Sequence, residues 1–164
     1  MVSDRGALGA SAELMRFLNA SGALYLDTQE SRGLVPSSHA SFVGAVRARA
    51  MKEADLVIAL GRKLDYQMGY GSPAVLPNAR WLRIADNTEE LRENRRGEVE
   101  LFAHPALALA ALAAALSQPG AVDIEWTQAL RAEYVRRSSK YAEDLARSPV
   151  GNDGRCQGSC RLNG

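Results

Sequence analysis

The chain has 164 residues, 46% of them hydrophobic, which is enough for one domain with a single core that buries roughly two-thirds of its unfolded surface. Twenty Lys and Arg residues against nineteen Asp and Glu residues leave a net charge of +1. This balance excludes the strong basic field with which proteins attract nucleic acid or acidic membrane surfaces, so neither partner is expected.

Cysteine usage and the first residues favour a cytoplasmic protein. Cys156 and Cys160 lie in a polar, Gly-rich tail and provide no disulfide framework. Met1 is followed by Val-Ser-Asp-Arg, which lacks the basic and apolar segments of an export signal. The longest apolar run, around residues 106–116, is too short to span a bilayer.

The first elements predict half of a βαβ unit. Residues 1–6 read as the last piece of a strand followed by a turn, from which we expect a fragment whose first strand is truncated. Ser11 is expected to cap a helix over residues 12–20 that ends at Gly22, and residues 23–27 are predicted to form a strand. A helix followed at once by a strand favours a parallel sheet with a right-handed crossover.

The next stretch predicts the centre of the sheet. Ser41 or a neighbour is expected to start a helix that runs to about Glu53. Five apolar residues in a row, Leu56 to Leu60, stopped by Gly61, are typical of a strand that is buried on both faces. Ligands of open α/β sheets bind outside the carboxyl ends of the strands, so we expect any site to begin in the loop over residues 61–65.

The remaining elements continue the alternation of strands and helices. We predict a strand over 80–84, with Trp81 at a sheet edge or under a loop, and a helix over 88–94 that Thr88 begins. A strand over 99–102 and a helix from Pro105 to Leu116, which packs tightly through its leucines, are expected next. The last predicted element is a mostly solvated or interdomain helix over 124–146, capped by Asp123.

These elements predict one α/β domain over residues 1–147. Its fold should be a Rossmann-like three-layer sandwich, with a mostly parallel sheet of about five to six strands and helices on both faces. Residues 148–164 are low in apolar residues and are expected to form a flexible linker or tail.

Motifs that carry chemistry are weak in this chain. The string from Gly69 to Ala74 matches Gly-x-Gly-x-x-Gly/Ala, but it does not directly follow a strand, so a flexible loop is favoured. His39 and His104 lack acidic or thiol partners at ligand spacing and are expected at the surface or in caps. The two cysteines have no second ligand pair, which makes a zinc site unlikely to form on this pattern.

Two strand-end residues are candidates for a binding site. Asp86 follows the strand that ends at Ile84, where acids of this fold class hydrogen-bond ribose hydroxyls, although helix capping before Thr88 is slightly favoured. Gly61 either permits a turn or lets the backbone approach a phosphate. Paired carboxylates, an activated nucleophile and a phosphate loop do not stand out in the sequence.

Several stretches, in order, resemble a known family. Glu30-Ser31-Arg32-Gly33-Leu34-Val35-Pro36 and Ala54-Asp55-Leu56-Val57-Ile58-Ala59-Leu60-Gly61-Arg62-Lys63-Leu64-Asp65 are similar to the central domain of thiamine-diphosphate-dependent enzymes of the acetolactate synthase group. Arg83-Ile84-Ala85-Asp86 and Glu90-Leu91-Arg92-Glu93-Asn94 look like that domain's strand-acid-turn and helix pattern. The resemblance covers roughly residues 1–117.

The resemblance implies a parent subunit of three domains. This domain would lie between a pyrimidine-binding and a diphosphate-binding domain, which together hold thiamine diphosphate and Mg²⁺, usually across a dimer interface. The parent is therefore expected to be a homo-oligomer. The catalytic glutamate and the metal-binding motif belong to the other two domains, so the resemblance implies no catalytic or metal-ligating residue in this chain.

The resemblance also implies candidate nucleotide contacts. In some family members the central domain binds FAD or ADP without redox use, and the matching positions here are Gly61, Lys63, Asp86 and Asn94. Ala85 and Ala103-His104 stand where the family pattern has acids. An empty or vestigial nucleotide site is therefore favoured over an occupied one.

Two hypotheses of function follow. The first is the structural central domain of an acetolactate synthase-like transferase or lyase, which decarboxylates a 2-oxo acid and joins or releases the acyl carbanion equivalent; benzaldehyde-lyase-like and oxalyl-CoA-decarboxylase-like parents come next. The chain alone is expected to be inactive.

The alternative is a stand-alone NAD- or FAD-type nucleotide-binding or regulatory module. A structural oligomerisation role merges with the first hypothesis and would be supported by exposed apolar surface on residues 106–116.

Overall fold

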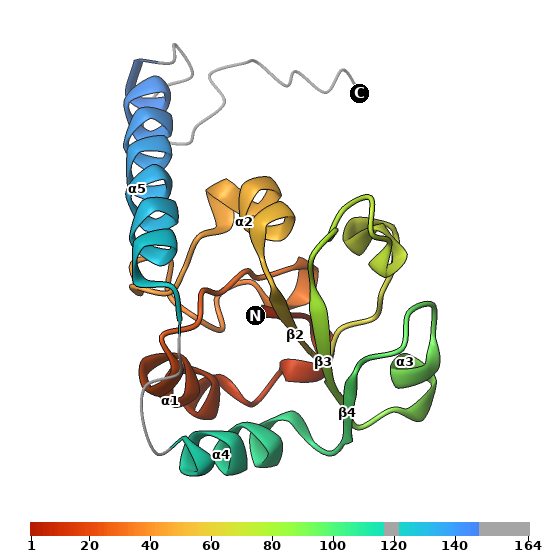
Figure 1. Ribbon diagram of the computed structural model, residues 1–164. Helices are drawn as coiled ribbons and strands as arrows, with labels where there is room; N and C mark the ends of the chain where they lie inside the picture. The colour runs from red at the N-terminus through yellow and green to blue at the C-terminus, as the bar shows by residue number, and fades with distance from the viewer. Residues whose placement is uncertain (117–121, 148–164) are drawn as a thin grey trace, which may run out of the picture.

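The computed structural model describes residues 1–116 and 122–147 (Figure 1). Its regular elements are β1 (Val2–Ser3), α1 (Ser11–Ser21), α2 (Arg47–Glu53), β2 (Leu56–Leu60), β3 (Arg80–Ala85), α3 (Thr88–Arg92), β4 (Val99–Phe102), α4 (Pro105–Ala115) and α5 (Ile124–Arg147). Short 3₁₀ turns lie between them: η1 (Arg5–Ala7), η2 (Gln29–Ser31), η3 (Gly44–Val46) and η4 (Tyr66–Gly71). The predicted tail over 148–164, with Cys156 and Cys160, lies outside the described residues.

The described strands form one parallel sheet of four strands in the order β1-β2-β3-β4. The prediction of five to six strands was too high, because the predicted strand over residues 23–27 forms only two isolated bridges. Leu26 bridges Val2, and Tyr25 bridges Phe42, both in parallel. This extended segment lies on the side of β1 away from β2, where a two-residue strand offers too few partners for a continuous ladder.

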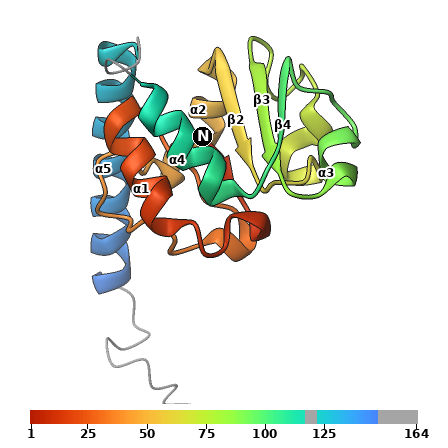
Figure 2. The ribbon, with the colours of Figure 1, turned by 90° about the horizontal axis from the view of Figure 1, so that it is seen from below.

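Helices cover both faces of the sheet, as predicted. Figures 1 and 2 show α1 and α4 together on one face and α2 on the other. The central strand β2 is buried from Val57 to Leu60, while Leu56 at its start is 46% exposed. The predicted burial on both faces is therefore confirmed for four of the five residues. Trp81 lies on the interior strand β3, only 1% exposed, under the guanidinium of Arg95.

Helix α3 begins at Thr88 as predicted and ends at Arg92, two residues before the predicted end, but the predicted caps Ser11 and Asp86 do not cap their helices. Ser11 is the first residue of α1, and its hydroxyl donates to the carbonyl of Leu34 and does not cap the helix. Neither Asp86 nor Thr88 caps α3, because the side chain of Asn87 accepts from the amide of Glu89. Predicted helix ends are commonly uncertain by this amount, since neighbouring polar residues compete for the same orphan amides.

The two other predicted helices differ in detail from the structure. The helix expected from Ser41 to Glu53 consists of the 3₁₀ turn η3 followed by the seven-residue α2. In α4, Leu109 is fully buried against the sheet, but Leu107 is 70% exposed. The leucines of α4 therefore do not all pack inward. Its N-terminus is as predicted, with Pro105 at the first position and His104 as cap.

The last helix, α5, packs on the domain only through its first half. Asp123 caps it as predicted, by accepting from the amide of Trp126. Leu130 and Tyr134 are buried, and the Tyr134 ring meets Phe42 edge-on at 5.6 Å between ring centroids. Every residue from 139 to 147 is exposed, and this part of the helix projects beyond α2 in Figure 1. The structure thus agrees with the expected solvated or interdomain character of this helix.

An acid-sensitive ion pair fixes the turn before β4. Both carboxylate oxygens of Glu100 accept from the guanidinium of Arg96, and Oε1 also accepts from the amide of Gly97 at 2.9 Å. The hydrogen bonds from Arg96 lower the pKa of Glu100 from 4.5 to about 2. A carboxylate with a lowered folded-state pKa stabilises the fold above its unfolded-state pKa, and this contribution is lost as the pH falls through the folded-state pKa.

We therefore expect Glu100→Gln to be less stable than the wild type above pH 4.5, and the difference to shrink between pH 4.5 and about 2. Urea unfolding at a series of pH values measures this. Glu30→Gln is the control, because the pair of Glu30 with Arg5 is exposed and 3.7 Å long. A stability difference that stays constant down to pH 2 would show that the charge of Glu100 contributes nothing.

Candidate functional site

The topology places the candidate site between the carboxyl ends of β1 and β2. From β1 the chain passes through α1 to the extended segment at Tyr25 and Leu26, on one side of β1. It then returns through α2 to β2 on the other side of β1. The direction of winding thus reverses at this point, and ligands of open α/β sheets bind in the crevice outside such a switch point. The residues that follow β1 and β2 decide what this crevice can hold.

Two glycines bring the backbones that follow these strands into direct contact. Gly61, directly after β2, has a left-handed φ of 51°, and a Cβ on it would lie 2.5 Å from Cα of Gly6. The amide of Gly6 donates to the carbonyl of Gly61 at 3.1 Å, and the amide of Gly61 donates to that of Ile84 at 2.7 Å. Gly61 is therefore a position of tight packing, and its amide already has a hydrogen-bond partner in the chain.

A buried ion pair joins the same two strand ends. The Arg62 side chain is completely buried, and its guanidinium donates to the carboxylate of Asp4, which follows β1. It also donates to Asp65 Oδ1 at 2.7 Å and to Gln67 Oε1 at 3.3 Å. Asp4 Oδ1 and Arg62 Nε are buried without a hydrogen-bond partner among the described residues. The crevice at the switch point is thus filled by opposite charges from the chain itself.

The other predicted contact residues lie around this pair, on the rim of the same end of the sheet. Lys63 Nζ lies 3.2 Å from Glu93 Oε1, and both side chains are partly exposed. Asn94, at a left-handed φ of 59°, donates its side-chain amide to the carbonyl of Leu64 at 2.6 Å. The structure therefore brings Lys63 and Asn94 to one place, where each already has a partner in the chain.

Asp86 lies exposed after β3, where an acid could meet a ribose hydroxyl. Its surroundings are acidic. Burial raises the pKa of Glu90 above the ordinary carboxyl range, and the negative charges of Asp86, Asp4 and Glu93 raise it further. Burial is the larger cause of the raised pKa and Lys63 acts in the opposite direction, so only part of the shift comes from the negative charges around Glu90.

Asp4 and Arg62 are the residues that reading the sequence missed. A usable signal was present, because an acid directly after one strand and an arginine just after a neighbouring parallel strand meet at the same edge of a sheet. Pattern alone did not show that these strands are neighbours. Nor did it show that Arg62 turns inward, since arginine is rarely buried unless it is paired.

The described residues do not fit the cofactors that the family resemblance implied. For FAD or ADP, the cation nearest the crevice is bound to two carboxylates, and the Gly61 amide is bound to Ile84. Mg²⁺ was expected in the other domains of the parent, and residues 1–116 and 122–147 contain no cluster of three His, Cys, Asp or Glu side chains that could hold a metal ion. Within the same residues, no helix is both long and apolar enough to cross a bilayer.

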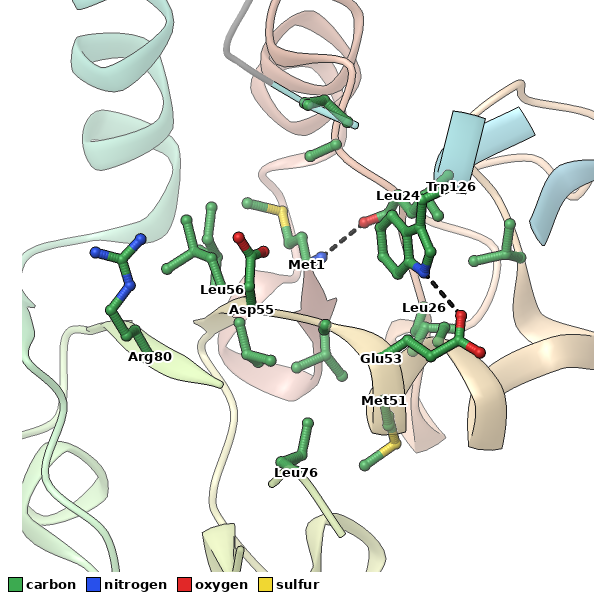
Figure 3. Close-up of a pocket in the computed structure, with 18 of the residues that line it drawn as sticks. Met1, Leu24, Leu26, Met51, Glu53, Asp55, Leu56, Leu76, Arg80 and Trp126 are labelled. Carbon is green, nitrogen blue, oxygen red and sulfur yellow. Dashed lines mark hydrogen bonds between the residues drawn. The ribbon is translucent and has the colours of Figure 1, made fainter. Parts of the chain in front are cut away.

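A separate cavity of about 510 Å³ lies at the opposite, amino end of the strands (Figure 3). Its wall is mainly apolar, with Leu24, Leu26 and Met51 facing the space beside the start of β2. At its rim the indole of Trp126 donates to Glu53 at 2.9 Å, which ties α5 to α2. This cavity lies away from the predicted contact residues and from the end of the sheet at which α/β folds bind nucleotides.

Comparisons with known proteins give sequence relatives of much greater length. A 2-hydroxyacyl-CoA lyase of Saccharomyces cerevisiae is 32% identical over 95 residues, which are 57% of this chain and 17% of that protein. The acetolactate synthase large subunit IlvG of Mycobacterium tuberculosis is 31% identical over 87 residues, 53% of this chain and 16% of that protein. The matched stretch thus covers only about one-sixth of the length of these relatives.

A solved structure and a family model agree with these relatives. The fold is similar to part of a thiamine diphosphate-dependent 4-hydroxybenzoylformate decarboxylase of Rhodococcus jostii RHA1, with a TM-score of 0.58 at 20% identity over 74% of this chain and 25% of that one. This likeness concerns the fold alone. The model described as "Thiamine pyrophosphate enzyme, central domain" matches residues 1–112. The chain therefore belongs to the family of thiamine pyrophosphate enzyme central domains.

Proposed function

We propose that this chain is the structural central domain of a larger thiamine-diphosphate-dependent enzyme and is not catalytic by itself. The match of the family model to residues 1–112 carries the proposal. Thiamine diphosphate acts as the electron sink for an acyl carbanion and needs a protein site that orients and activates it. We assign both thiamine diphosphate and Mg²⁺ to the pyrimidine-binding and diphosphate-binding domains of the parent, as the family resemblance implies.

For the parent we propose an acetolactate synthase-like reaction, in which a 2-oxo acid is decarboxylated and the acyl carbanion equivalent is joined to an acceptor. A 2-hydroxyacyl-CoA lyase-like cleavage is the second candidate, because the relatives of that name have similar identity to this chain, 32% against 31%. Both reactions pass through carbanion chemistry on the same cofactor, and substrate choice depends on residues of the other domains.

An antibody raised against this chain tests the proposal in the cells that produce it. The expected result is a band several times heavier than the 17.7 kDa of this chain. The immunopurified protein should consume pyruvate in the presence of thiamine diphosphate and Mg²⁺, whereas the 164-residue chain should not. Consumption of a 2-hydroxyacyl-CoA and not of pyruvate would favour the second candidate. A single band at 17.7 kDa would contradict the proposal.

We further propose that the parent is a homo-oligomer and resides in the cytoplasm. Exposed apolar side chains support an interface role, with Phe102 at the end of β4 64% exposed and Leu107 on α4 70% exposed. Light scattering of the purified parent and fractionation of the cells measure these two properties. A monomeric parent, or one found outside the cytoplasm, would refute the respective statement.

The alternative hypothesis is a stand-alone nucleotide-binding module. It requires an accessible nucleotide site, and the switch point is where this fold class places one. Titration with adenine nucleotides tests whether such a site exists, and a native protein of 17.7 kDa would separate a stand-alone module from a domain of a larger parent.

A further inference from the structure

We propose that the Asp4–Arg62 ion pair and the Gly6–Gly61 contact close the switch-point crevice, so that this domain holds no nucleotide. Arg62 supplies the positive charge that balances Asp4 there. The inference concerns the chain's own residues and does not depend on the reaction of the parent. It differs from the general structural role, because a structural domain can also carry a bound nucleotide.

The first argument is steric. A diphosphate at a switch point normally approaches free backbone amides at a glycine-rich turn after a strand. Here the backbone that faces Gly61 belongs to Gly6, so close that neither glycine has room for a Cβ. The amide of Gly61 is bound to Ile84, and that of Gly6 to Gly61 itself. A phosphate could reach these amides only if the two backbones separated.

The second argument is electrostatic. Asp4 directly follows β1 and is 8% exposed, so a negative charge is buried at the point where a diphosphate would have to lie. Arg62 neutralises this charge and also binds Asp65, and its Nε, which has no partner among the described residues, is buried. On the rim, Lys63 is paired with Glu93. Two nearby acids, Asp86 and Glu90, add negative charge.

The third argument is accessibility. The two polar atoms of the pair that lack partners, Asp4 Oδ1 and Arg62 Nε, are buried from solvent and therefore from a ligand that enters from solvent. Breaking such a pair by removing one partner leaves an uncompensated buried charge, which is strongly destabilising. Opening the crevice for a nucleotide would break the hydrogen bonds that Arg62 donates to Asp4 and Asp65. The pair thus holds the ends of β1 and β2 together in the absence of any ligand.

Calorimetric titration of the 164-residue chain with ADP, FAD and NAD tests the proposal. We expect no saturable heat up to about 1 mM nucleotide, and no shift of the midpoint of thermal unfolding at that concentration. Micromolar binding of any of the three, abolished by Asp86→Ala, would overturn the proposal. It would instead establish the predicted contact site.

A double-mutant cycle tests the internal role of Arg62. Arg62→Met should lower the midpoint of urea unfolding strongly, because Asp4 is then left buried and charged. Adding Asp4→Asn to Arg62→Met should recover part of that loss. Arg5→Met is the matched control, since it removes an arginine at the same edge whose side chain is 79% exposed. The cycle compares the effect of Asp4→Asn on stability in the wild type with its effect in Arg62→Met. If Asp4→Asn lowers stability equally in both, the pair is not coupled and the proposal fails.

Where Arg62→Met does not fold, Arg62→Lys supplies the same information, because it keeps the charge but loses the two-carboxylate fork. It should be intermediate in stability and still silent to nucleotides. Nucleotide binding gained in Arg62→Lys would show that the crevice admits ligands and would contradict the proposal. None of these outcomes bears on the mass or the activity of the parent, so the two proposals fail independently.

Discussion

Gly61→Ala is expected to destabilise the domain by about 3–5 kcal/mol, near the upper end of single-residue effects. A left-handed φ of 51° accounts for about 1–2 kcal/mol of this, since an L-residue with a Cβ is strained there. The rest arises from the clash of the new Cβ with Gly6, whose Cα would lie 2.5 Å away. Relief requires the backbones after β1 and β2 to separate, which also weakens the Asp4–Arg62 pair. Equilibrium unfolding in urea measures the change.

Gly9→Ala is the matched control for this prediction. Gly9 also has a left-handed φ, of 84°, but a Cβ there would meet no atom within 4 Å. It should therefore cost only the conformational part, about 1–2 kcal/mol. Gly6→Ala tests the contact from the other side, because its Cβ would lie 2.7 Å from Gly61 Cα. If Gly61→Ala and Gly9→Ala were equally destabilising, the close contact would have no energetic weight.

Arg83→Met is expected to destabilise the domain by about 3–5 kcal/mol through the loss of buried hydrogen bonds. Arg83 lies on β3, is 1% exposed, and donates to the carbonyls of Glu90, Leu91, Glu93 and Arg95. These carbonyls belong to the end of α3 and the segment after it, which lack helical partners. Methionine fills most of the space but leaves the carbonyls unpaired, at about 1–3 kcal/mol for each one that stays buried.

Arg80→Met is the control for this second prediction, since Arg80 lies on the same strand with an exposed side chain. It should change stability by less than about 0.5 kcal/mol. Hydrogen exchange gives a local readout: amides of α3 should exchange faster in Arg83→Met and not in Arg80→Met. A loss below about 1 kcal/mol for Arg83→Met would show that water replaces the guanidinium at no great cost.

Arg83 also links the fold to the candidate site. The segment that it holds includes Glu93, the partner of Lys63, and leads to Asn94, which binds the carbonyl of Leu64. Loosening this segment should therefore loosen the rim of the crevice. Asn94 and Glu93, the partner of Lys63, thus belong to a segment that a buried arginine on β3 holds in place.

The sequence predicted the architecture well where apolar residues and helix-start residues clearly marked an element. The apolar run from Leu56 to Leu60, the strand that contains Trp81 and the helix that starts at Pro105 all form as expected. Strong patterns of this kind reflect burial, which every arrangement of these elements must satisfy. Weak segments were decided by their neighbours: residues 23–27 were expected to form a strand, but β1 is too short to pair with them as a ladder.

The candidate site was predicted in location but not in content. The loop after β2 does lie at the switch point, and Gly61, Lys63, Asp86 and Asn94 all lie at that end of the sheet. Whether they bind a nucleotide stays a prediction. Gly61, Lys63 and Asn94 have their partners Gly6, Glu93 and Leu64 far from them along the chain, and local spacing carries no information about such contacts.

The sequence by itself determined that this chain is an α/β domain of the thiamine pyrophosphate enzyme central-domain family, because the pattern of apolar residues and the order of its motifs are local properties that survive divergence. Only the tertiary structure decided what the switch point contains. Asp4 and Arg62 are separated by 58 positions, and either charge alone is typical of a solvated surface or of a ligand contact. Their burial against each other follows from the parallel pairing of β1 and β2, which brings two loops of opposite charge to one edge of the sheet.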